Sequence, residues 1–152
     1  MTRLCTIITA ALLASSAFAR IGETEQQIEA RYGKSKATSR SNGVVSRAYS
    51  YRGFSVMASF ENGVCRGERY QKTPVPLPLL DADIGALLGV NAGGGKWHQV
   101  PDSSADRLVL IIYRGANGRL AMHNSVENTL LITSEDFVAR MSSRHAQELK
   151  GF

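Results

Sequence analysis

The sequence has few of the residues from which small proteins build disulfides and metal sites. Its 152 residues include two cysteines and three histidines. Two cysteines exclude a disulfide-dense scaffold. The histidines, His98, His123 and His145, do not stand at a metal-ligand spacing from Cys65 or from one another. We therefore expect neither a bound metal nor a cofactor.

Long apolar runs are also absent, which argues against a membrane span, since a spanning helix needs about 20 such residues. The main apolar run, residues 4–14, follows Arg3 and precedes Ala17-Phe18-Ala19, a small-residue pattern typical of signal-peptidase sites. We expect residues 1–19 to be a signal peptide that is cleaved before Arg20. The mature chain would then be periplasmic or secreted.

A capping pattern marks the first predicted helix. Thr24 stands three residues before Gln27, which is the capping-box spacing. Gly33 suits a helix C-terminus, so we predict a helix over residues 25–32. The polar stretch 34–43 is predicted to be a loop.

Alternating side chains then predict three strands between residues 44 and 71. In the middle strand, residues 54–60 alternate, and the buried face is predicted to hold Phe54, Val56, Ala58 and Phe60, with Ser55, Met57 and Ser59 between them. Asn62-Gly63 is a strong hairpin signal, because a type I′ turn needs two positive φ angles. Arg52-Gly53 is predicted to join the first of these strands, residues 44–51, to the middle strand.

Three prolines, Pro74, Pro76 and Pro78, interrupt the pattern, and each removes a backbone donor. We interpret residues 73–78 as an extended connector between two units, 20–72 and 79–152. The second unit is predicted to hold a helix capped by Asp81 with Ile84, Leu87 and Leu88 on one side, strands near 97–100, 108–113, 119–123 and 129–133, and a last helix through Leu149.

The expected fold is therefore α+β, with two helix-plus-antiparallel-meander units and a C-terminal helix. The interval from Gly33 to Gly63 nearly equals the interval from Gly89 to Gly118. A tandem duplication explains this spacing. Small α+β proteins also place helices and Asn-Gly turns at such intervals, so both explanations stay open.

The segment Ile21-Gly22-Glu23-Thr24, followed by a helix ending in Arg31-Tyr32-Gly33-Lys34 and by a hairpin, resembles small bacterial α+β modules. It is similar to the outer-membrane-assembly lipoproteins of the SmpA/OmlA type and to β-lactamase-inhibitor-like proteins. It also resembles uncharacterised secreted bacterial proteins with Arg-Tyr-Gly and a Phe-x-Asn-Gly hairpin. The resemblance implies protein–protein recognition on a sheet face, although the lipid-accepting cysteine of the lipoproteins is missing.

Candidate reactive groups are few. Cys65 has no nearby CxxC partner, and a small buried side chain is the common role of such a cysteine. The glycines of Gly93-Gly94-Gly95-Lys96 follow a predicted helix, whereas a phosphate-binding loop runs from a strand into a helix. We expect no enzyme. A small secreted enzyme that uses Cys65 or His98 is the alternative.

Positive charge is concentrated between Arg31 and Lys72, where nine lysines and arginines accompany two glutamates. Strand alternation places Arg47, Tyr49 and Tyr51 on one face of their strand. It also places Arg66 and Tyr70 on one face of the third strand. Tyr and Arg are common in binding hot spots. We therefore predict a partner-binding surface of Arg47, Tyr49, Tyr51, Arg66 and Tyr70. A solvated sheet face with tyrosines at the core edge is the other interpretation.

These features predict an exported, non-catalytic recognition module that binds an acidic protein or an anionic envelope component. Binding to a nucleic-acid backbone is an alternative. Export and the lack of a nucleic-acid-binding motif argue against it.

Overall fold

The computed structural model describes residues 20–74, 77–101 and 109–150. It confirms the α+β class. Within these residues the elements are α1 (Glu25–Tyr32), β1 (Ala37–Ser41), β2 (Val44–Tyr51), β3 (Phe54–Glu61), β4 (Val64–Lys72), α2 (Asp81–Val90), β5 (His98–Gln99), β6 (Leu110–Arg114), a 3₁₀ turn (Ala116–Gly118), β7 (Arg119–Asn124), β8 (Thr129–Ser134) and α3 (Glu135–Leu149). None of the helices described is long and apolar enough to cross a membrane.

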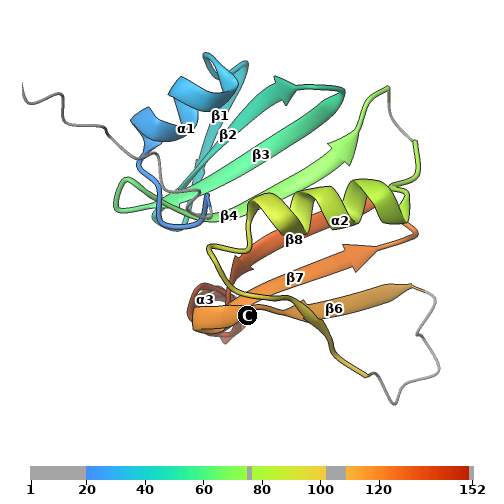
Figure 1. The fold of residues 1–152 in the computed structure, drawn as a ribbon. Coiled ribbons are helices and arrows are strands. Elements are labelled where there is room, and N and C mark those ends of the chain that lie inside the picture. The colour runs from blue at the N-terminus through green and yellow to red at the C-terminus, as the bar shows by residue number, and fades with distance from the viewer. Residues whose placement is uncertain (1–19, 75–76, 102–108, 151–152) are drawn as a thin grey trace, which may run out of the picture.

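The strands form one antiparallel sheet in the order β1-β2-β3-β4-β8-β7-β6-β5 (Figure 1). The halves join where β4 pairs with β8, with Gly67 opposite Thr133. Each half places a helix before four strands in a meander, and α3 follows the second. The duplication itself stays a prediction. Residues 75–76, in the expected connector, lie outside the described residues.

The predicted first helix and its caps are confirmed. Thr24 and Gln27 form the capping box, because each side chain accepts a hydrogen bond from the other residue's backbone N–H. Gly33 ends α1 with a φ of 85°, a conformation that favours glycine. Ile28 and Tyr32, one turn apart, bury the inner side of this helix.

The three strands predicted between residues 44 and 71 are present as β2, β3 and β4. Asn62 and Gly63 both have positive φ angles, as the hairpin prediction required, and so do Arg52 and Gly53. The predicted inner face of β3 is buried at three of its four positions, whereas Phe54 is partly buried.

The prediction of a loop over residues 34–43 was wrong, because β1 occupies Ala37–Ser41 and pairs with β2. All five β1 residues are exposed, so this edge strand carries no apolar alternation that could reveal it. The Asn42-Gly43 turn, with φ angles of 51° and 75°, is the one local signal that could have revealed the hairpin.

The second predicted helix begins one residue away from the expected cap. Asp81 is the first residue of α2 and Leu80 is its N-cap, so the assignment of Asp81 as the cap was wrong. The Asp83 carboxylate satisfies the free backbone donor, since Leu80 N–H donates to Asp83 Oδ2 at 2.9 Å. Ile84, Leu87 and Leu88 are buried, as predicted.

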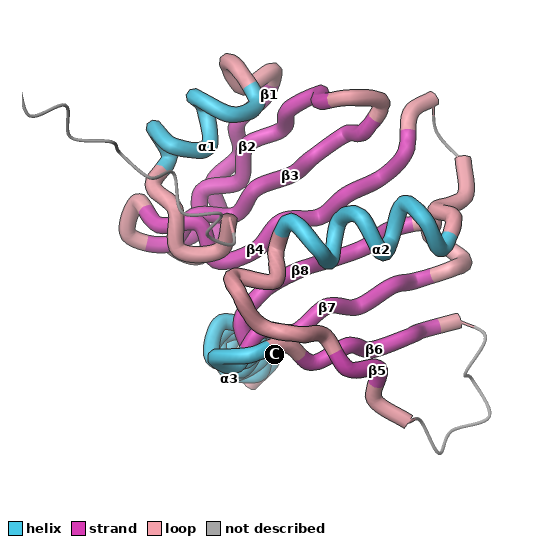
Figure 2. Tube along the Cα trace, in the orientation of Figure 1, coloured by secondary structure: helices cyan, strands magenta, loops and turns pink. Residues whose placement is uncertain are grey.

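The helices cover opposite faces of the sheet (Figure 2). α1 and α2 pack on the face that holds Phe60 and Tyr70. Glu61, next to Phe60, points to the other face by strand alternation. α3 lies on that second face, because Arg144 of α3 donates to Glu61 at 2.7 Å. The main core therefore lies between the sheet and the pair α1 and α2.

Candidate functional site

The five residues of the predicted partner-binding surface are mostly inside the fold. Tyr49 and Tyr70 are each 1% exposed, and Tyr51 is partly buried against the edge of the Tyr32 ring, with ring centroids 5.1 Å apart. Alternation did place them on one side of the sheet. α1 and α2 cover that side, so these tyrosines serve the core and are not exposed to a partner.

Arg47 is committed to α1. Its guanidinium donates to Glu25 at 2.6 Å and to Glu29 at 3.2 Å, one helical turn apart on α1. The sequence offered a signal for this pairing in the i, i+4 spacing of the two glutamates. Arg47 therefore holds the helix on β2, and its charge is already balanced.

Arg66 lies at a β-bulge, where the β3–β4 register shifts between Phe60 and Ser59. The extra residue changes the alternation, so that Cys65 and Glu68 are both fully buried although they stand three residues apart. The predicted sharing of one face by Arg66 and Tyr70 rested on strict alternation. The bulge removes that basis.

A buried polar cluster occupies the centre of the core and consists of Arg20, Tyr32, Glu68, Tyr70 and Asn91. Arg20 Nη1 donates to the hydroxyls of Tyr32 and Tyr70, at 2.5 and 2.9 Å. Tyr70 donates to the Glu68 carboxylate and accepts from Asn91 Nδ2 at 3.3 Å. These hydrogen bonds offset part of the cost of keeping polar groups in an apolar core.

The electrostatics of the cluster follow from its burial. Removal from water raises the pKa of both the Tyr32 and the Tyr70 hydroxyls, so both stay protonated. Burial also raises the pKa of Glu68, although the Tyr70 hydrogen bond and the Arg20 charge oppose the shift. Arg20 Nε, Glu68 Oε1 and Asn91 Oδ1 are buried with no hydrogen-bond partner among the described residues.

In the sequence, Arg20 stands out only as the first residue after the expected cleavage site. In the structure its side chain is 8% exposed and belongs to the core. No local pattern distinguishes an arginine that enters the core from one on the surface, because its partners lie on distant strands and helices. The burial of the Arg20 side chain is therefore visible only in the structure.

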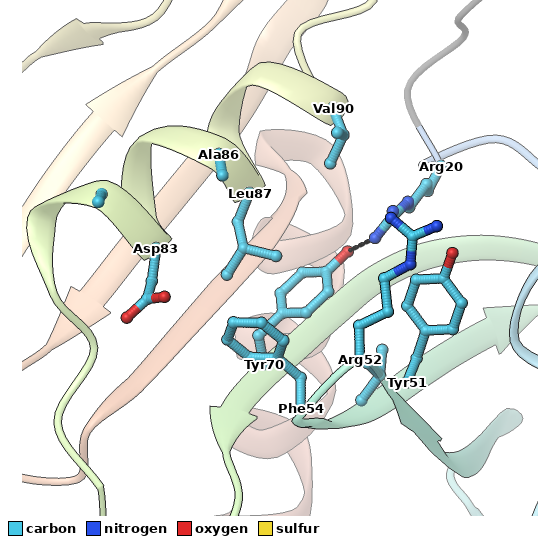
Figure 3. Close-up of a pocket in the computed structure, with 11 residues that line it drawn as sticks. Arg20, Tyr51, Arg52, Phe54, Tyr70, Asp83, Ala86, Leu87 and Val90 are labelled. Carbon is cyan, nitrogen blue, oxygen red and sulfur yellow. Dashed lines mark hydrogen bonds between the residues drawn. The ribbon is translucent and has the colours of Figure 1, made fainter.

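A pocket of about 240 Å³ lies between α2 and the turn that joins β2 to β3 (Figure 3). Its lining is mainly apolar, with Leu87 and Val90 from α2 and Phe54 from β3. Tyr70 also lines it, so the pocket is next to the buried polar cluster. A concave apolar site with a few polar groups is typical of ligand-binding pockets.

Charged groups stand at the two ends of this pocket. Arg20 and Arg52 line one end, and Asp83 lines the other, as Figure 3 shows. Arg52 stacks over the Tyr51 ring, with its guanidinium carbon 5.1 Å from the ring centroid. Asp83 is neutralised by Lys72 at 2.8 Å. The net charge around the pocket is therefore positive at the arginine end.

The alternative enzyme residues are not brought together. Cys65 is fully buried on β4, where desolvation raises the pKa of its thiol and keeps it protonated. His98 is exposed on β5, and three strands separate β4 from β5 in the sheet. Within residues 20–74, 77–101 and 109–150, no cluster of His, Cys, Asp and Glu could hold a metal ion.

Comparison with known proteins yields likenesses of fold. No protein-family model matches the sequence, and no curated protein is detectably similar to it. A cysteine-rich secretory protein from Staphylococcus aureus has a TM-score of 0.53 at 8% identity, over 78% of this chain and 46% of that chain. An extracellular SCP-domain protein from Bacillus anthracis has a TM-score of 0.52 at 10% identity, over 90% and 52%.

The chain thus spans about half the length of these two proteins, and the identities show a shared fold alone. The expected kinship with SmpA/OmlA lipoproteins and β-lactamase-inhibitor-like proteins was wrong, because the structural neighbours are SCP-type secretory proteins. The resemblance rested on residues 21–34, which specify one capped helix. A capped helix is a local feature that unrelated topologies share.

Proposed function

We propose that this protein is an exported, non-catalytic recognition module that binds an acidic protein or an anionic envelope component. Its contact surface is the basic end, defined as Lys34, Lys36 and Arg52. These residues lie where β1 begins and β2 ends. Lys36 N–H donates to Ala48 O at 2.8 Å, which ties the residue before β1 to the second half of β2, the strand that leads to Arg52.

One observation carries this proposal: the basic end has exposed cations that no carboxylate neutralises. All three side chains are exposed, and no ion pair involves them in the part of the chain that the structure describes. Arg47, by contrast, pairs with two glutamates of α1. Unpaired charges of one sign raise the association rate with an oppositely charged partner and add salt-dependent affinity.

Export is supported by three observations. Residues 1–19, which lie outside the described residues, have the pattern of a cleavable signal peptide. The structural neighbours are described as secretory and extracellular proteins. Arg20 is a core residue, so cleavage before it would leave the fold intact, whereas cleavage after it would remove a buried side chain.

The test is a crosslinked pull-down from the envelope fraction with the purified mature protein. Charge reversal of the basic end (Lys34→Glu, Lys36→Glu and Arg52→Glu together) is expected to reduce capture at least tenfold and to remove its salt dependence. The control reverses three exposed cations elsewhere, Arg40, Arg69 and Lys96, so that the net charge changes equally. Equal loss in both triple variants would contradict a localised binding surface.

A further inference from the structure

The pocket next to α2 has a size that fits a small molecule. Its volume of about 240 Å³ equals about eight water volumes, since each water occupies about 30 Å³ of the liquid. An apolar body of about eight non-hydrogen atoms therefore matches its size. Leu87, Val90 and Phe54 present apolar surface to such a body, and burying that surface favours binding.

The arginine end of the pocket offers positive charge to a ligand. Arg20 is 8% exposed and carries a buried Nε–H that has no hydrogen-bond acceptor among the described residues. A buried donor without an acceptor is costly. Arg52 is exposed and takes part in no ion pair within the described chain. Its planar guanidinium suits two parallel hydrogen bonds to a carboxylate.

The acidic groups around the pocket leave this positive charge in place. Asp83 accepts from Lys72 Nζ at 2.8 Å and from Leu80 N–H at 2.9 Å, so its charge is held at the far end. Glu68 is 0% exposed and is reached from Arg20 through the Tyr70 hydroxyl. The unpaired positive charge at this end is therefore that of Arg52, and a cationic or neutral ligand would leave it unmatched.

We propose that this pocket binds a small monocarboxylic acid with an apolar body. The carboxylate lies at the Arg20 and Arg52 end, and the body lies against Leu87, Val90 and Phe54 (Figure 3). This site goes beyond the proposed function, because the occupant is a small molecule held between α2 and the β2–β3 turn. Arg52 is the one residue that the pocket shares with the basic end.

The test is isothermal titration of the purified protein with octanoate. Octanol, with the same length of chain and no charge, and acetate, with the charge and no body, are the matched ligands. We expect octanoate to bind at least tenfold more tightly than either. Arg52→Gln should weaken octanoate by about tenfold and leave octanol unchanged, because it removes charge and keeps the shape.

A second variant fills the pocket. Ala86 is an exposed residue of α2 that lines the pocket, so Ala86→Phe places a ring there without disturbing the core. We expect it to abolish octanoate binding. Gly89→Ala on the same helix is the control, because a Cβ at Gly89 meets no atom within 4 Å and Gly89 does not line the pocket.

Three results would overturn the proposal: no octanoate binding at millimolar concentration, equal affinity for octanol, or unchanged binding in Ala86→Phe. This failure is distinct from failure of the recognition module. Ala86→Phe keeps Lys34, Lys36 and Arg52, so it should still capture an acidic partner in the pull-down. Lys34→Glu, which keeps Arg52, would separate the two sites in the other direction if it weakened capture and left octanoate affinity normal.

Discussion

Arg20 and Tyr70, fifty positions apart in the sequence, meet in the core, where the guanidinium donates to the hydroxyl at 2.9 Å. The same guanidinium also stacks on the rings of Tyr32 and Tyr70. The Tyr70 hydroxyl in turn donates a hydrogen bond to the Glu68 carboxylate. The segment before α1 is thereby joined to the central strand β4 through a charge that the core accepts only because it is partnered.

Removal of this arginine is expected to be costly. Arg20→Met keeps most of the apolar stem but leaves Glu68 without its positive counterpart, and breaking a buried charge network from one side costs about 3–5 kcal/mol. The urea midpoint, read by circular dichroism, measures the change in the free energy of unfolding. Arg69→Met, at an exposed position on β4, is the control and should change stability by about 0.5 kcal/mol or less. Similar losses in the two variants would contradict the anchoring role.

Glu68 should make the fold less stable as pH rises. Because burial raises its pKa, the folded protein binds the proton more tightly than the unfolded chain. The resulting stability is complete below the ordinary pKa of glutamate and is lost as pH rises through the raised value. Glu68→Gln removes this titration, so the variant should gain on the wild type with rising pH, by at most about 1.4 kcal/mol per pH unit. Urea unfolding at several pH values measures it, and a constant difference would contradict it.

Glu61 should show the opposite sign. Burial opposes ionisation there, but hydrogen bonds from Arg144 and Arg140 outweigh it and lower the pKa of Glu61. Its contribution is present above the ordinary pKa and is lost as pH falls through the lowered value. Both arginine side chains are more than a third exposed, so we expect Glu61→Gln to cost only about 1 kcal/mol.

Hydrogen exchange locates the effect of Glu61→Gln. Amides of α3 should exchange faster in the variant at neutral pH, because Arg140 and Arg144 attach α3 to the end of β3. Amides of α1, on the other face of the sheet, serve as the internal control. Uniform acceleration in α1 and α3 would show that Glu61 supports the whole fold instead of the docking of α3.

The parts of the fold that local rules determine could be predicted from the sequence. The capping box at Thr24, the turns at Arg52-Gly53 and Asn62-Gly63, and the buried side of α2 depend on residues close in the chain. They therefore appear where periodicity and turn chemistry placed them. The edge strand β1 was not predicted, because only its pairing with β2 defines it and an edge strand can be polar on both faces.

The site depends on contacts that the sequence does not display. The sequence predicted that Arg47 binds a partner, whereas in the structure α1 brings Glu25 and Glu29 to it. The bulge at Arg66 reversed the alternation on which one face assignment rested. Tyr70 is a core residue because α1 and α2 cover the face of the sheet on which it lies. Arg20 is buried with it, through its hydrogen bond to the Tyr70 hydroxyl. Long-range packing decided each of these cases.

Cys65 should be inert in the native protein. Its side chain is 0% exposed, its Sγ donates to Gly67 O at 3.7 Å, and burial raises the pKa of the thiol. A disulfide reagent such as dithionitrobenzoate should therefore react with it only through unfolding, at a rate that rises with urea. The unfolded protein provides the reference rate. Fast reaction of the native thiol would revive the thiol-enzyme alternative.

The two halves of the sheet should unfold together, because the β4–β8 pairing makes one continuous core. Trp97, the only tryptophan in the sequence, reports on the second half, since its indole N–H donates to Leu88 O at 2.8 Å. Far-ultraviolet circular dichroism reports on the whole chain. We expect both signals to change at the same urea concentration.

Gly67→Ala tests the β4–β8 pairing, since the added Cβ would lie 3.3 Å from Thr133 Oγ1. It should lower both midpoints equally and cost roughly 1 kcal/mol, whereas a midpoint that shifts for only one signal would show that the halves fold independently.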